Sequence, residues 1–190
     1  MELATAIRGR RSTAPITDLA PSDTELAEYL QLAAHSPDHA GLRPWRLITV
    51  RGDGRRQLGE ALVAGFGDEP GTPAADKTAA KALRAPLLVS IIATPVEHPK
   101  VPRWEQLAAV GALVATLQLV LFDAGYTAMW RTGPAVELDT VRDLLGVAEH
   151  EQLLGWLYVG GTSGDAGPEI EPDISGKLST LADPAPEVVR

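Results

Sequence analysis

The longest apolar stretch of the chain begins near Trp104 and ends just before Gly125. Apolar residues fall on more than one face of a helix drawn through it, which predicts a helix over residues 103–124 that is buried nearly all round. At about 1.5 Å per residue, this helix would span roughly 30 Å. Gly125 is expected to end it. In a chain of this length the pattern suggests a central helix, or one that faces a second subunit.

Weaker periodic patterns predict the remaining elements. Helices are expected over residues 2–8, from a capping box at Ser22 and Glu25 up to Pro37, and over residues 55–66, 74–84 and 139–146. Strands are expected over residues 46–50, 87–93, 126–130 and 153–159. The uninterrupted apolar run over 87–93 is typical of a strand that is covered on both faces.

Turn signals and composition set the boundaries between these elements. Gly52-Asp53-Gly54 is expected to form a turn, and Asp139 is expected to cap the helix that follows it. Residues 163–190 are rich in Gly, Pro, Ser and Asp, which predicts an irregular C-terminal tail. The length of 190 residues fits one domain over residues 1–190.

Composition excludes several classes of function. The net charge of −8 argues against nucleic-acid binding, in which phosphate neutralisation dominates affinity. The chain has no cysteine, so disulfides, thiolate nucleophiles and cysteine-ligated metals are excluded. Residues 1–8 lack the pattern of a signal peptide, and the apolar run over 107–122 is short for a membrane span of about 20 residues. A cytoplasmic protein without a membrane or nucleic-acid partner is therefore expected.

Common catalytic motifs are also missing from the sequence. No glycine-rich dinucleotide or phosphate loop follows a predicted strand, and residues 161–164 do not form a nucleophile elbow. The four histidines show no zinc-binding spacing, so no metal site is expected. The lack of an evident nucleophile favours either a cofactor that carries the chemistry or no chemistry at all.

Arg10, Arg11 and Ser12 place two guanidinium groups and a hydroxyl directly after a predicted helix end. The planar fork of arginine suits the oxygens of a phosphate, and a serine hydroxyl can complete such a cradle. The same three residues would also fit a basic turn that is exposed to solvent. The sequence therefore leaves both interpretations open, a phosphate-binding segment and an exposed surface turn.

Two further segments carry candidate residues. His39 lies in a loop before Pro44-Trp45, with His35 four residues upstream, and suits either a ligand contact or an exposed position. Trp130, Arg131 and Thr132 end a predicted strand, where ligands often bind. There, Trp130 would supply an apolar wall and Arg131 a donor, although a core tryptophan beside a surface arginine fits equally well.

Five short motifs, in their order and spacing, resemble the FMN-dependent nitroreductase family, especially its small NAD(P)H nitroreductases. The resemblance extends over roughly residues 1–162. The motifs are Arg10-Arg11-Ser12, Ser36-Pro37-Asp38-His39 with Pro44-Trp45, Arg84-Ala85-Pro86, Lys100-Val101-Pro102-Arg103-Trp104-Glu105-Gln106, and Trp130-Arg131-Thr132-Gly133. His35 stands where relatives carry arginine, and Thr132 stands where they often carry serine.

The resemblance implies an α+β fold with a mixed, mostly antiparallel sheet flanked by helices, and a homodimer with FMN at the subunit interface. It implies that Arg10, Arg11 and Ser12 hold the phosphate and ribityl chain of FMN. His39 and His35 would contact the flavin from the same subunit, and Trp130, Arg131 and Thr132 from the other. A second basic phosphate ligand near the C-terminus is not identified, and Lys177 is the candidate in that region.

The resemblance also implies an activity. NAD(P)H would bind along one segment at the end of the long helix, formed by Val120, Leu121, Phe122, Asp123, Ala124 and Gly125. The enzyme would then reduce a nitroaromatic, quinone or enone in a ping-pong hydride-transfer cycle, with no protein side chain assigned a catalytic role. A flavin-binding carrier or sensor without turnover is the alternative.

Overall fold

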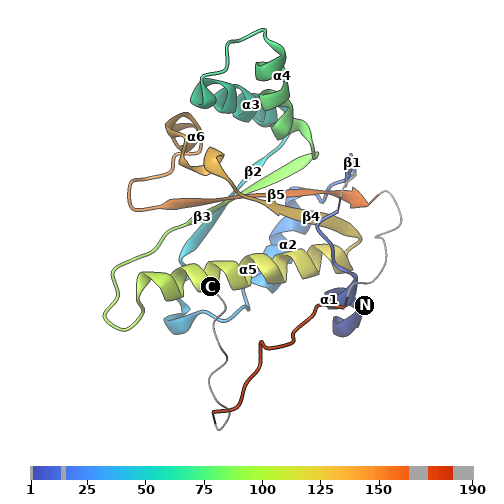
Figure 1. Ribbon diagram of the computed structural model, residues 1–190, viewed down its shortest axis with the longest axis vertical. Helices are drawn as coiled ribbons and strands as arrows, with labels where there is room; N and C mark the ends of the chain where they lie inside the picture. The colour runs from blue at the N-terminus through green and yellow to red at the C-terminus, as the bar shows by residue number, and fades with distance from the viewer. Residues whose placement is uncertain (1, 14–15, 163–170, 182–190) are drawn as a thin grey trace.

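An antiparallel sheet with helices on both faces forms the frame of the molecule (Figure 1). The computed structural model describes residues 2–13, 16–162 and 171–181. The strands are β1 (Ile16–Thr17), β2 (Trp45–Val50), β3 (Leu87–Ala93), β4 (Tyr126–Arg131) and β5 (Gln152–Thr162). Their order is β1-β5-β3-β2, and β4 pairs with β5. Every pairing among these strands is antiparallel, which confirms the expected α+β class.

The helices form one layer on each face of this sheet (Figure 1). They are α1 (Leu3–Gly9), α2 (Asp23–Ala33), α3 (Gly52–Phe66), α4 (Pro73–Ala79), α5 (Arg103–Asp123) and α6 (Asp139–Leu144). Short 3-10 turns are η1 (His39–Gly41), η2 (Ala80–Leu83) and η3 (Pro134–Glu137). The helices α2 and α5 share one core with the sheet, and α3 and α6 share the other.

The two cores follow from the alternation of side chains along β3 and β5. Leu87, Val89 and Ile91 face the core beneath α5, whereas Leu88 and Ile92 face the core beneath α3. All seven residues of β3 are buried, as the continuous apolar run predicts. The sheet therefore separates the molecule into two sides, and each side carries its own cavity.

Helix α5 is buried on one face only, so the expected burial all round is wrong for a single chain. Its buried residues are Gln106, Val110, Leu113, Val114, Leu117, Gln118 and Leu121. By length and composition the helix passes as a membrane span, but these residues belong to the core beneath the sheet. The opposite face stays apolar and uncovered because one chain offers only one surface for α5 to pack against.

Several predicted boundaries were wrong for local reasons. Residues 52–54 form the first turn of α3, where Asp53 accepts hydrogen bonds from Arg56 and Gln57. The segment expected as one helix over 74–84 divides into α4 and η2. Asp139 is the first residue of α6 and makes no capping bond. The capping box of Ser22 and Glu25 is confirmed, with both reciprocal bonds present.

The C-terminal region has a described part and an undescribed part. Residues 171–181 contain no helix or strand, and all of them are exposed, including Lys177. The rest of the tail expected over 163–190 lies outside the described residues.

A partly buried ion pair ties the turn before β5 to β2. The Arg46 guanidinium donates from Nε and Nη2 to the two carboxylate oxygens of Glu151, over 2.8 Å and 2.6 Å. Arg46 also donates to the carbonyl of Gly146, and the Glu151 side chain is only 10% exposed. The hydrogen bonds from Arg46 are the main reason why the pKa of Glu151 falls from 4.5 to about 2.

Replacing this carboxylate gives a pH-dependent loss of stability. Because the pKa of Glu151 is lower in the folded chain, its stabilisation is fully present above about pH 4.5 and is lost as the pH falls toward 2. Allowing for solvent screening, we expect Glu151→Gln to cost about 1–2 kcal/mol at pH 7 and less at pH 3.5. Urea unfolding at both pH values measures this, with the exposed neighbour Glu149→Gln as the control. An equal cost at both pH values would contradict it.

Candidate functional site

The Arg10-Arg11-Ser12 segment lies at a junction between α1, α5 and β4. Gly9 approaches α5 so closely that an added Cβ would lie 2.9 Å from Cζ of Phe122. Beyond the segment, the Thr13 hydroxyl lies 3.3 Å from that of Thr127 in β4. The sequence between these two contacts is thereby held over the side of α5.

A groove of about 440 Å³ opens at this junction. It is lined by Ile7, Arg10, Ser12, Ala115, Gln118, Leu119 and Trp130. The side of α5 forms its floor. The end of α1 forms one wall, and the indole ring of Trp130 in β4 forms the other. A cation, a hydroxyl and an amide thus face one open space beside an aromatic ring.

The structure distinguishes Arg10 from Arg11. Arg10 lines the groove, and its guanidinium has no hydrogen-bond or ion-pair partner among the described residues. Arg11 donates from Nη1 to the carbonyl oxygens of Arg8 and Arg10 instead, and lines a separate, smaller cleft of about 220 Å³ near Gly125. Arg10 is therefore the better placed residue to bind an anion in the groove.

Trp130 and Arg131 face opposite sides of the sheet because they are consecutive in β4. The indole Nε1 of Trp130 donates to the carbonyl of Leu154 over 2.9 Å, which fixes the ring beside Arg10 and Ser12 of the same chain. The expected contact of Trp130 with the flavin of a second subunit stays a prediction. Arg131 points away from this groove, toward α3.

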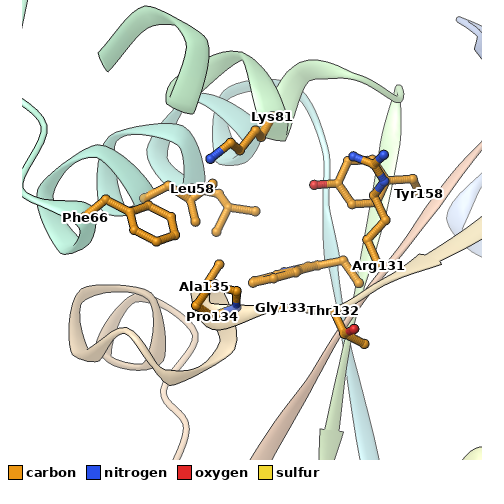
Figure 2. A pocket seen from close by; sticks show the side chains of 11 residues that line it. Leu58, Phe66, Lys81, Arg131, Thr132, Gly133, Pro134, Ala135 and Tyr158 are labelled. Carbon is orange, nitrogen blue, oxygen red and sulfur yellow. The ribbon is translucent and has the colours of Figure 1, made fainter. Parts of the chain in front are cut away.

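On the α3 side, Arg131 and Thr132 line a second cavity of about 400 Å³ (Figure 2). The Arg131 guanidinium lies 5.5 Å from the centre of the Tyr158 ring. Burial raises the pKa of Tyr158, and the positive charges of Arg131 and Arg84 oppose this only in part. The Tyr158 hydroxyl therefore keeps its proton at neutral pH and remains a hydrogen-bond donor.

His39 lies far from Arg10 within one chain. Its Nδ1 is 2.7 Å from a carboxylate oxygen of Glu105, in the first turn of α5. The groove adjoins Gln118, which is 13 residues or roughly 20 Å further along the same helix. His35, at the end of α2, is exposed, and neighbouring Ser36 hydrogen-bonds to Thr116 of α5. One chain therefore does not bring His39 to Arg10, whereas the residue after His35 contacts α5 two residues from Gln118.

The segment predicted for the nicotinamide cofactor is partly core. Leu121 is fully buried beneath the sheet and cannot contact a ligand directly. Val120 and Phe122 are half-buried, whereas Asp123, Ala124 and Gly125 are exposed. Helix α5 ends at Asp123 with Ala124 as its C-cap, and Gly125 comes directly after that cap with φ of +87°. Only the half-buried and exposed residues of this segment can contact a ligand.

Sequence reasoning missed two residues that the structure places in the cavities. Gln118 is only 9% exposed and borders the groove, and its signal was a single amide within a long apolar run. Lys81 lines the second cavity, and nothing in its local sequence marks it. Among the described residues, no cluster of His, Asp and Glu is arranged to hold a metal ion.

Comparison with known proteins identifies the class that this fold and groove define. The model of the nitroreductase family matches residues 7–161. The chain therefore belongs to the nitroreductase family, which confirms the resemblance read from the five motifs.

Individual relatives agree with this assignment. The chain is 32% identical over 165 residues to "Putative NAD(P)H nitroreductase YdjA" of Escherichia coli (strain K12), covering 84% of this chain and 88% of that protein. A nitroreductase-like protein from Bacillus cereus superposes with a TM-score of 0.85 at 22% identity, covering 96% and 97% of the two chains. The FMN-dependent nitroreductase NfnB from Mycobacterium smegmatis in complex with NADPH gives 0.70 at 18% identity, covering 93% and 96%.

Proposed function

We propose that this protein is a cytoplasmic FMN-dependent NAD(P)H oxidoreductase and that the groove at Arg10 holds the flavin. The observation that carries the proposal is the Arg10 guanidinium, which has no partner among the described residues and lies beside Ser12 in a groove with an indole wall. The family relatives support the choice of cofactors, since one is named an NAD(P)H nitroreductase and another is FMN-dependent and bound to NADPH.

The residues of the groove fit the chemistry of FMN. Arg10 offers a planar fork of donors to a phosphate, and Ser12 adds a hydroxyl. Gln118 has an amide that can both donate to and accept from a polar edge. Trp130 is held in place by its own hydrogen bond, so its ring can serve as a rigid apolar wall. Arg11 is the weaker candidate because backbone carbonyls already occupy it.

We further propose that the site is completed by a second copy of the chain. The uncovered face of α5 is an apolar stripe with large residues at the ends and small ones near Gly111, where an added Cβ would meet no atom of the described residues within 4 Å. If two such helices cross antiparallel at Gly111, residue 105 of one lies opposite residue 117 of the other. The partner subunit's Glu105 and His39 would then stand beside the groove at Gln118.

When bound, FMN supplies the hydride-transfer chemistry. The chain would hold the phosphate at Arg10, orient the ring against Trp130 and exclude water through the α5 interface. NAD(P)H would bind first at the open side of the groove and leave after reducing the flavin. The acceptor, a nitroaromatic, quinone or enone, would then bind at the same place, which makes the cycle ping-pong. Residues 122–125 are the surface segment available to the nicotinamide cofactor.

The visible spectrum of the purified protein tests the proposal directly. We expect a yellow protein whose flavin absorbance bleaches on adding NADH or NADPH and returns with a quinone. Protein that binds no FMN would overturn the proposal. Bound FMN that neither nucleotide reduces would favour a carrier or sensor without turnover.

Removing the Arg10 guanidinium should weaken FMN binding. We expect Arg10→Ala to cost about 1.5–3 kcal/mol, since a hydrogen bond to a charged phosphate would be lost. Fluorescence titration of the apoprotein with FMN measures the dissociation constant. Arg11→Ala is the matched control and should have a clearly smaller effect, because its guanidinium is engaged by backbone carbonyls. Equal losses for both variants would refute the distinction between them.

A further inference from the structure

The second cavity, on the α3 side of the sheet, holds two positive charges and no negative one. It has a volume of about 400 Å³, within the range of small-molecule sites. None of its 11 lining residues is acidic, and two of them are Lys81 and Arg131. We propose that it binds a flat aromatic anion, such as an aromatic carboxylate, at a site separate from the flavin groove.

Both cations lack a neutralising partner among the described residues. The Nζ of Lys81 lies 4.9 Å from the centre of the Phe66 ring, and the Arg131 guanidinium lies 5.5 Å from that of Tyr158. Arg131 makes one further contact, from Nε to the sulfur of Met129. Aromatic faces can hold a cation in place without cancelling its charge. The charges therefore remain available to a carboxylate, which the cavity itself does not supply.

An uncharged donor faces the same cavity. In Figure 2, the Tyr158 hydroxyl points into the space bordered by Lys81 and Arg131. Trp156 also lines the cavity, but its indole Nε1 is buried, so Trp156 offers the ligand apolar surface. The tyrosine hydroxyl and the two cations together therefore select an acceptor-rich anion.

The rest of the lining selects a flat apolar body. Leu58, Leu62 and Phe66 form the side provided by α3, and Pro134 and Ala135 lie across from them in Figure 2. These walls offer carbon surface and no polar group that would hold a sugar or a chain of hydroxyls. An aromatic ring with one carboxylate matches both halves of the lining, the charged half and the apolar half.

The cavity and the flavin groove are distinct because β4 lies between them. Trp130 faces the groove and Arg131 faces the cavity, as consecutive strand residues must. The inference therefore does not depend on the proposed flavin site. In this proposal Arg131 binds the aromatic anion, whereas the sequence had predicted that it contacts the flavin.

Calorimetric titration of the FMN-loaded protein with 2-naphthoate tests the inference. We expect saturable binding that Lys81→Met weakens by at least about tenfold, since one charge-assisted contact is lost. Lys77→Met, an exposed lysine one helical turn earlier, is the matched control and should leave binding unchanged. The neutral isostere 2-naphthamide should bind at least about tenfold more weakly than the anion.

The two proposed sites should respond to different substitutions. Arg10→Ala should reduce affinity for FMN and spare that for 2-naphthoate, and Lys81→Met should do the reverse. Equal binding of the acid and the amide, or equal effects of Lys81→Met and Lys77→Met, would overturn the anion site. Binding seen only in the absence of FMN would show that the cavity belongs to the flavin site, and would overturn the claim of a separate one.

Discussion

Gly111→Arg is expected to prevent formation of the dimer proposed above and to abolish tight FMN binding. An arginine here would not clash with the described part of a single chain, in which an added Cβ has no neighbour within 4 Å. Two helices that cross closely at this residue have no room for the side chain, and its charge would be buried without a partner. Light scattering after size exclusion measures the mass, and titration with FMN measures the affinity.

The control is Ala64→Arg, an equally large change at an exposed position of α3 on the other side of the sheet. It should leave both mass and FMN affinity unchanged. Thermal unfolding of Gly111→Arg separates misfolding from dissociation, because helix α5 keeps its buried face in the monomer. A wild-type monomer that binds FMN tightly would contradict the two-chain site, and so would a dimeric Gly111→Arg variant.

Local sequence predicted those parts of the fold that local chemistry determines. The capping box at Ser22 depends on two residues three positions apart, and both of its predicted hydrogen bonds are present in the structure. The apolar run of β3 has no polar position to expose, so a strand covered on both faces follows. Neither feature requires knowledge of a distant contact.

Features that depend on distant contacts were not predictable in the same way. The two-residue strand β1 exists only through its pairing with β5, which is more than 140 residues away. The covered and open faces of α5 have similar apolar composition, so the sequence alone could not show which one meets the sheet. The start of α3 was missed because glycines at 52 and 54 suggest a turn, whereas the bonds of Asp53 stabilise a helix.

For the candidate site, the sequence identified residues better than it identified their grouping. Arg10, Ser12 and Trp130 do line one groove. Arg131 lines the other cavity, as the alternation of side chains along a strand indicates for a neighbour of Trp130, and its expected flavin contact stays a prediction. Lys81 joins Arg131 only through the tertiary packing of η2 against α3, for which no local pattern exists.

Gly155→Ala should be among the most destabilising single substitutions in the chain. Its φ of +106° is strained for any residue with a Cβ, and an added Cβ would lie 2.2 Å from the carbonyl oxygen of Arg131. Because that atom is backbone at the end of β4, relief requires β4 and β5 to separate. We expect a cost of about 3 kcal/mol or more, and a fall in Tm on the order of 10 °C.

Gly54→Ala provides the matched control. Gly54 lies within helix α3, and its added Cβ would meet only Val50 Cγ1, at the ordinary contact distance of 3.5 Å. That substitution should raise stability by about 0.5–1 kcal/mol. Gly155→Ala should also disturb both cavities, since Trp130 and Arg131 lie on either side of the displaced strand end. Unchanged stability in Gly155→Ala would mean that β4 and β5 do not approach as closely as this geometry requires. Loss of stability with FMN affinity fully retained would place the flavin away from the end of β4.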